Sequence, residues 1–207
     1  MKMNTNRPPF SHAAENIENR DKNEKAANRL LRQAGIEAIP VPVERIAKFL
    51  GAQVRFAPFD GELSGLIYRE DGDTRGVVIG VNSFHAPTRR RFTLAHEIGH
   101  LFLGHLEEDK MGELHIDRKF KARDARSSQA VDDEEIAANA FAAALLMPAQ
   151  KLREDFAQFR LDSIEFFDFE DDELARALAE RYNVSLQAML IRLTRLGLIS
   201  YPHEGDA

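Results

Sequence analysis

The chain has 207 residues, of which 43% are hydrophobic and 30% are charged, and it contains no cysteine. This composition predicts a soluble globular protein with one main domain and a substantial core. The net charge of −6 gives no general attraction to phosphate backbones or anionic membranes, so direct nucleic-acid binding is not expected. The absence of cysteine excludes disulfides and thiolate ligands, so any zinc must be held by histidine and carboxylate.

The two ends of the chain carry few large apolar side chains. Residues 1–22 are rich in asparagine and mixed charge, which predicts a flexible polar tail, and residues 201–207 predict a second tail. The start lacks the apolar stretch of a signal peptide, and no run approaches the ~18 apolar residues of a membrane span. We therefore expect a cytoplasmic protein without a membrane partner, folded over residues 23–200.

The first part of the folded region predicts two helices and a sheet. Residues 25–35 and 43–51 have the pattern of short helices, each closed by a glycine. Three β-rich runs follow at residues 53–59, 64–70 and 75–82, separated by aspartate and glycine. They predict a small antiparallel sheet.

The second part is mostly helical by its pattern. A helix is expected over residues 87–104, whereas residues 107–133 are highly charged and show no periodicity. An alanine-rich helix over residues 134–148 ends at a proline. Further helices are expected around residues 149–159 and, as a pair with helix-turn-helix character, within residues 165–200. The predicted class is α+β, with the small sheet packed on the helix at 87–104.

That helix carries the sequence His-Glu-Ile-Gly-His at residues 96–100. Because each helical residue advances about 100°, His96 and His100 lie about 40° apart on one face, where both imidazoles can bind one metal ion. Glu97 lies beside them and can take a proton from a metal-bound water. A chain of this composition would contain roughly 0.02 copies of the pattern by chance. A metal is the simplest partner for such polar groups on an otherwise apolar helix.

A catalytic zinc site normally takes three protein ligands and one water, so the chain must supply a third. Glu135 is one candidate, because it lies on the alanine-rich helix, whose small residues permit close approach to the motif helix. His115 and Glu134 compete with it. His105 is a fourth candidate, although on a continuing helix it would lie about 180° from the first histidine unless the preceding glycine redirects it.

Several motifs in order along residues 26–200 resemble the ImmA/IrrE-type metallopeptidases of bacteria and their mobile elements. The motifs are VVIGVN, RRRFTLAHEIGHLFLGH, RDARSS, EEIAANAFAAALLMP and LAERYNVSLQAMLIRLTRLGLI. The resemblance implies a zincin-like metallopeptidase fold in which one Zn²⁺ per chain, or another divalent ion, is bound by His96, His100 and Glu135. It also implies that Glu97 is the general base and that Asn139 completes the family's E-x-x-x-N stretch.

The activity implied by this resemblance is that of a zinc-dependent endopeptidase in which Glu97 acts on a zinc-bound water. Such proteases cleave helix-turn-helix repressors and thereby regulate transcription in a mobile element or a stress response. The expected partner is a separate repressor or a protein like the antitoxin of a toxin–antitoxin pair. Candidate donors to the tetrahedral oxyanion are His115, Tyr68 and Arg123. Residues 77–82 are a candidate sheet edge for the substrate, and part of 107–133 is expected to border the cleft.

The alternative interpretation is a DNA-binding or protein-interaction regulator with a structural metal. It rests on the helix-turn-helix character of residues 171–199, with Asn183 at the turn and Ser185 as the cap of the second helix. Charge opposes DNA binding, because residues 170–207 carry seven acids and four bases, a net charge of −3. We therefore expect these helices to pack on the peptidase core or to bind a protein.

Overall fold

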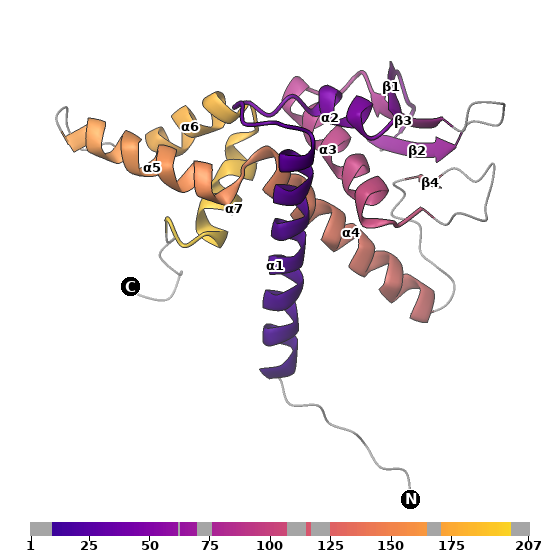
Figure 1. Ribbon diagram of the computed structural model, residues 1–207, viewed down its shortest axis with the longest axis horizontal. Coiled ribbons are helices and arrows are strands. Elements are labelled where there is room, and N and C mark those ends of the chain that lie inside the picture. The colour runs from indigo at the N-terminus through magenta and orange to yellow at the C-terminus, as the bar shows by residue number, and fades with distance from the viewer. Residues whose placement is uncertain are drawn as a thin grey trace, which may run out of the picture.

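The computed structural model describes residues 10–61, 63–69, 76–106, 115–116, 125–164 and 171–199. Two long helices occupy the middle of the molecule, α3 (Pro87–Leu103) and α4 (Ala125–Leu146). In Figure 1 the sheet lies to one side of these helices and the C-terminal helices lie to the other. Helix α1 (Phe10–Gln33) packs along α4, and α2 (Val43–Phe49) contacts α3.

Four strands form one sheet in the order β1-β3-β2-β4. Their bounds are β1 Ala52–Ala57, β2 Gly65–Arg69, β3 Val77–Asn82 and β4 His115–Ile116. Every residue of β3 is buried, because this apolar strand has neighbours on both edges. Side chains from one face of the sheet, among them Ile67, Ile79 and Val81, join the main core together with α3.

The sheet is mixed, which corrects the prediction of an antiparallel one. Strand β2 is antiparallel to both β3 and β4, but β1 runs parallel to β3, with Ala52 beside Val77 and Ala57 beside Asn82. Because β2 occupies one edge of β3, the other edge is the place left for β1. The buried β3 thereby finds hydrogen-bond partners for its backbone on both sides.

Helix α3 begins and ends where the sequence predicts. Pro87 lies in its first turn, where the missing N–H removes no helical hydrogen bond, and Gly104 ends the helix in the left-handed conformation with a φ of 81°. Residues 93–100 are all buried. The polar motif therefore lies in the interior, between the sheet and α4.

Two helices start earlier than predicted. Helix α1 begins at Phe10, so residues 10–22 are helical where the sequence predicts a flexible tail. Helix α4 begins at Ala125, inside the segment 107–133 that is predicted to lack regular structure. Neither early stretch contains glycine or proline to stop a helix. Both lack a clear apolar periodicity, which is why the pattern alone did not reveal them.

Three helices complete the chain: α5 Ala149–Ile164, α6 Asp171–Tyr182 and α7 Leu186–Arg195. The turn between α6 and α7 has the predicted features, since Asn183 adopts a positive φ of 52° and Ser185 caps α7 through its side chain. The α+β class and the mostly helical C-terminal part are thus confirmed. No helix within the described residues combines the length and apolar character needed to cross a bilayer.

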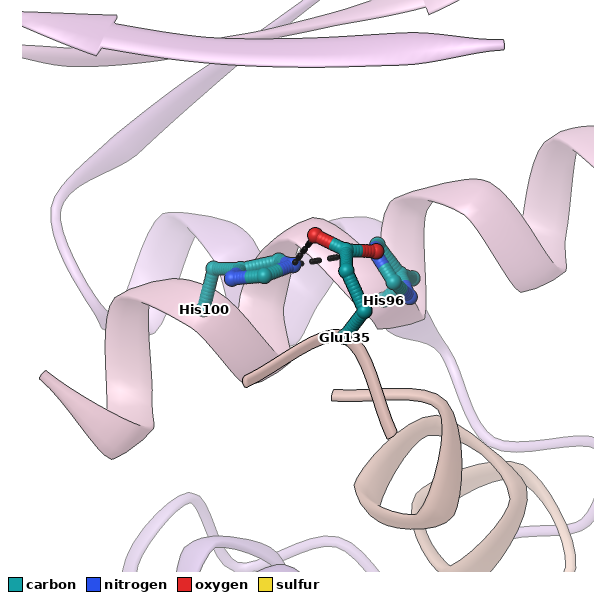
Figure 2. Close-up of side chains that lie close together, drawn as sticks. All are labelled: His96, His100 and Glu135. Carbon is teal, nitrogen blue, oxygen red and sulfur yellow. Dashed lines mark hydrogen bonds and ion pairs between the residues drawn. The ribbon is translucent and has the colours of Figure 1, made fainter. Parts of the chain in front are cut away.

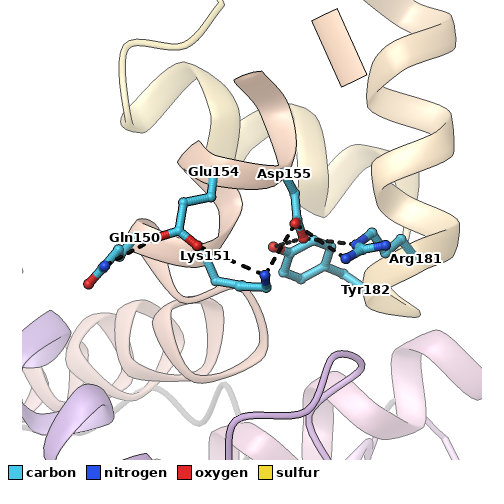
Figure 3. Close-up of polar contacts among 6 residues, drawn as sticks. All are labelled: Gln150, Lys151, Glu154, Asp155, Arg181 and Tyr182. Carbon is cyan, nitrogen blue, oxygen red and sulfur yellow. Dashed lines mark hydrogen bonds and ion pairs between the residues drawn. The ribbon is translucent and has the colours of Figure 1, made fainter. Parts of the chain in front are cut away.

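Ionic contacts hold these C-terminal helices to each other and to the rest of the chain. Asp155 on α5 accepts hydrogen bonds from the Tyr182 hydroxyl and the Arg181 guanidinium, both at 2.8 Å (Figure 3). Arg192 on α7 donates to the Glu24 carboxylate on α1 at 2.8 Å and to the carbonyl that follows α4 at 2.9 Å. Asp155 therefore lies beside a cation and a hydroxyl donor, and Glu24 lies beside a cation.

Candidate metal centre

His96 and His100 lie one turn apart on α3 and are almost fully buried, with 5% and 1% of their surfaces exposed. Their Nε2 atoms are 2.9 Å apart. The two rings therefore point to the same place, as their spacing of four residues predicts.

Glu135 reaches this place from the facing helix, α4. Its carboxylate oxygens lie 3.2 Å from His96 Nε2 and 3.2 Å from His100 Nε2, and Figure 2 shows the carboxylate between the two rings. One ligand atom from each of the three residues lies within 4.8 Å of the others. The structure thus brings together the three residues that the sequence indicates as metal ligands, and within its described part Glu134 does not join them.

Close packing of α3 against α4 makes this convergence possible. A Cβ added to Gly99 would lie 3.2 Å from Phe141 Cδ1 and 3.3 Å from the backbone of Ala138. A larger residue at Gly99 would therefore push the two helices apart. The sequence indicates the small residues of α4, but it does not reveal that the glycine inside the motif meets them.

Asn139, one turn after Glu135 on α4, contacts the far nitrogen of the first histidine. Its Oδ1 lies 3.1 Å from His96 Nδ1. Because an amide oxygen only accepts hydrogen bonds, His96 Nδ1 is the donor in this contact. In a neutral imidazole with its proton on Nδ1, the lone pair of Nε2 points to the shared site, as a metal ligand requires.

His105 does not reach the shared site and lies instead behind His100. Its Nδ1 is 3.1 Å from His100 Nδ1, the nitrogen that faces away from His96. Within the described residues, the group with metal-ligand geometry therefore contains two histidines and one glutamate.

The chemistry of the converging atoms favours a cation. Two imidazole nitrogens 2.9 Å apart, with a carboxylate 3.2 Å from each, repel one another unless a proton or a metal ion lies among them. Burial raises the pKa of Glu135, but hydrogen bonds from His100 and His96 and their charge outweigh it, so that this pKa falls well below its usual range. Two imidazoles and one carboxylate fit zinc at an open site, and they also suit other divalent ions.

Glu97 lies beside the site, on the side of α3 that faces the sheet, and is fully buried. A Cβ added to Gly65, the first residue of β2, would lie 2.8 Å from Glu97 Oε1 and 2.5 Å from Thr93 Cγ2. Only glycine therefore lets β2 approach the Glu97 carboxylate this closely. The sequence gives no sign of this contact, because the two residues are distant along the chain.

Asn82 is a second residue that the sequence does not reveal. It is 1% exposed, and its side-chain amide donates to the carbonyls of Phe59 at 3.1 Å and Leu63 at 2.8 Å. Its Oδ1 accepts from the Phe84 N–H at 3.0 Å. Asn82 thus fixes the connection that leads into β2, and with it the position of Gly65. A buried asparagine that ends an apolar strand was the available signal.

Of the three candidate oxyanion donors, one points away from the site, and the structure does not describe the side chains of the other two. Tyr68 lies three residues after Gly65, so its side chain points to the opposite face of β2, away from α3. There its hydroxyl accepts a hydrogen bond from Arg55 at 3.2 Å, which removes it from the candidates. The side chain of His115 and the whole of Arg123 lie outside the described residues.

The predicted substrate edge is wrong. Residues 77–82 form β3, which is paired on both sides and cannot accept a further strand. Most of the segment 107–133, which is predicted to border the cleft, lies outside the described residues.

Comparison with known proteins assigns the chain to a family. A family model described as the IrrE N-terminal-like domain, a peptidase family, matches residues 47–194. The chain belongs to this family. The match runs from α2 to α7 and includes the residues around the candidate metal centre.

One curated relative supports this assignment, and a solved structure shares the fold. The radiation response metalloprotease IrrE of Deinococcus radiodurans is 32% identical over 177 residues, which cover 82% of this chain and 45% of that protein. A solved transcriptional regulator of Mycobacterium tuberculosis has a similar fold over 86% of this chain and 50% of its own, with a TM-score of 0.54 and 18% identity. The chain thus spans no more than half of either relative.

Proposed function

We propose that this protein is a metal-dependent endopeptidase, with zinc as the metal. The observation that carries the proposal is the convergence of His96, His100 and Glu135 beside a buried glutamate. Membership of a peptidase family supports it, as does the metalloprotease activity named for a relative that is 32% identical.

In this proposal each residue has a distinct role. His96, His100 and Glu135 hold the metal, and Asn139 keeps the first imidazole in the tautomer that offers Nε2. A divalent metal bound there supplies Lewis acidity toward the peptide carbonyl and the attacking water. Glu97 takes a proton from that water and delivers it to the leaving amine nitrogen. Burial of His96, Glu97 and His100 limits the access of bulk water to these groups.

The proposed substrate is a cytoplasmic protein, either a helix-turn-helix repressor or an antitoxin-like protein. Its support is the resemblance of the ordered motifs to regulatory peptidases that cut such repressors. The role in the radiation response for which the Deinococcus relative is named is consistent with a regulator of stress.

The alternative, DNA binding through α6 and α7, is weakened by where the arginines lie. Arg192 is 7% exposed and binds Glu24, whereas Arg181 binds Asp155. Two of the four bases in this part of the chain are therefore already engaged with carboxylates. The remaining charge is acidic, which disfavours contact with phosphates.

A paired measurement of metal content and cleavage tests the proposal. Purified protein should carry about one Zn²⁺ per chain by elemental analysis, and it should cleave a helix-turn-helix repressor or an antitoxin-like protein of the same organism. The variant His100→Ala should lose both properties, whereas His85→Ala, a histidine outside the cluster, should retain both. Stoichiometric metal in the His100→Ala variant would exclude the assigned ligand set.

A further inference from the structure

His105 occupies a defined place although it lies outside the candidate ligand group. It follows α3 and stands edge-on to the second histidine of the motif, with ring centroids 5.0 Å apart and an interplanar angle of 72°. The contact joins the Nδ1 atoms of the two rings at 3.1 Å. His105 therefore touches the nitrogen of His100 that does not face the candidate metal position.

The end of α3 explains how His105 reaches this place. Nine residues along a continuing helix would put it on the opposite side from His96. Gly104 adopts the left-handed conformation instead, and the His105 N–H bonds back to the His100 carbonyl at 3.0 Å. The chain turns back on itself, and the side chain returns to the last turn of the helix.

The contact between the two Nδ1 atoms matters because a neutral His100 ring has only one N–H. A neutral imidazole has one N–H, so a ring that offers the Nε2 lone pair to a metal must carry its proton on Nδ1. That N–H needs an acceptor in the interior. His105 Nδ1 lies within reach of that N–H, at 3.1 Å from His100 Nδ1, and it accepts when the His105 proton lies on Nε2.

We propose that His105 is a positioning residue for the metal: it accepts the Nδ1–H of His100 and thereby holds the His100 Nε2 lone pair on the metal position. The proposal rests on the proposed function, because it assumes that His100 is a ligand. In this proposal each histidine of the motif has one residue that accepts its Nδ1–H. Asn139 on α4 orients His96, and His105 after Gly104 orients His100.

Zinc affinity of the full-length protein tests this role, measured by competition with a chromogenic chelator. The variant His105→Leu removes the acceptor and should weaken Zn²⁺ binding by about 10- to 100-fold. The variant His105→Asn keeps an acceptor near the position of Nδ1 and should recover most of that loss. His85→Leu is the matched control and should bind as the parent does. If the Leu variant does not fold, His105→Ala replaces it and is compared with His105→Asn.

The visible spectrum of Co²⁺-loaded protein separates a positioning residue from a ligand. A positioning role predicts the same spectrum in the parent and in His105→Leu, because the ligand set is unchanged. An altered spectrum, unchanged zinc affinity of the Leu variant, or an Asn variant as weak as the Leu variant would each overturn the proposal. A parent protein that binds no zinc would instead refute the proposed function. A parent that binds zinc and cleaves its substrate, with a Leu variant of equal affinity, refutes the role of His105 alone.

Discussion

Two regions of the molecule pair their ionisable side chains in opposite ways. Around the C-terminal helices two acids contact a cation or a hydroxyl: Asp155 binds Arg181 and Tyr182, and Glu24 on α1 binds Arg192 on α7. Between α3 and α4 the converging atoms are two imidazole nitrogens and a carboxylate, all of which can donate an electron pair. In the first arrangement the positive and negative charges of the side chains cancel. In the second arrangement the converging lone pairs need a proton or a metal ion among them.

A lowered pKa alone would not distinguish the two sites. Burial raises the pKa of Asp155, but hydrogen bonds from Tyr182 and Arg181 outweigh it and lower that pKa. The pKa of Glu135 is lowered in the same way by two histidines. The difference lies in the partners, because an arginine is a permanent cation, whereas an imidazole can give up its proton and offer its lone pair to a metal. The following predictions test whether this distinction holds.

The largest effect is expected from Glu97→Gln, which alters the chemistry beside the candidate metal centre without altering the shape of the side chain. The amide cannot take the proton of the attacking water, so kcat/KM for cleavage of the repressor-like protein should fall by about 10² to 10⁴. Zinc content should stay the same, because Glu97 is not among the proposed ligands. Undiminished proteolysis by this variant would mean that another group is the base.

The variant Gly65→Ala should also impair cleavage while it spares the metal. The added methyl group would lie 2.5 Å from Thr93 Cγ2 and 2.8 Å from Glu97 Oε1, so α3 and the Glu97 carboxylate must shift away from β2. A displacement of the base by about 1 Å can cost about 10² in rate. The matched control is Gly80→Ala, whose methyl group would press on Phe59 and Leu66 on the other face of the sheet. Equal loss of activity in both variants would show that general damage to the sheet, and not the position of Glu97, is responsible.

At the contact between α1 and α7, Glu24→Gln should lower stability and leave zinc affinity unchanged. The substitution leaves the Arg192 guanidinium, whose side chain is 8% exposed, without a charged partner. We expect the free energy of unfolding to fall by about 2 kcal/mol, because hydrogen bonds between charged groups contribute more than neutral ones. Urea denaturation measures this effect, with the exposed Glu37→Gln as control. A loss of zinc affinity in Glu24→Gln would contradict the view that the contact between Glu24 and Arg192 and the candidate metal centre act independently.

The smallest effect, and the most specific in its pH dependence, is expected from Asp155→Asn. The variant should be about 1.5 kcal/mol less stable at pH 7. Because the folded-state pKa of Asp155 lies below its ordinary value of 3.8, the contribution of its charge is fully present above that pH and is lost as pH falls through the folded pKa. The difference in unfolding free energy should therefore stay constant from pH 7 to pH 5 and shrink below pH 3.8. A difference that persists at pH 2 would assign the effect to packing.

The sequence by itself determined the parts of this protein that depend on local pattern. The spacing of His96 and His100, the proline that opens α3 and the glycine that closes it follow from helical geometry and backbone conformation, and the structure confirms them. The cap at Ser185 was predictable for the same reason. Each of these features is encoded within a few consecutive residues.

Only the tertiary structure decided which distant residues meet. Among the described side chains it brings Glu135, and not Glu134 or His105, to the two histidines, because α4 faces α3 across Gly99 and places that carboxylate between the rings. It placed β1 parallel to β3 and Gly65 against Glu97, contacts that no local periodicity specifies. His105 lies between these cases. The sequence contains the glycine that can turn the chain, but only the packed helix end shows that the imidazole returns to His100 and not to the metal position. Local patterns fix the direction of a side chain within its own element, whereas the meeting of two elements depends on the packing of the whole core.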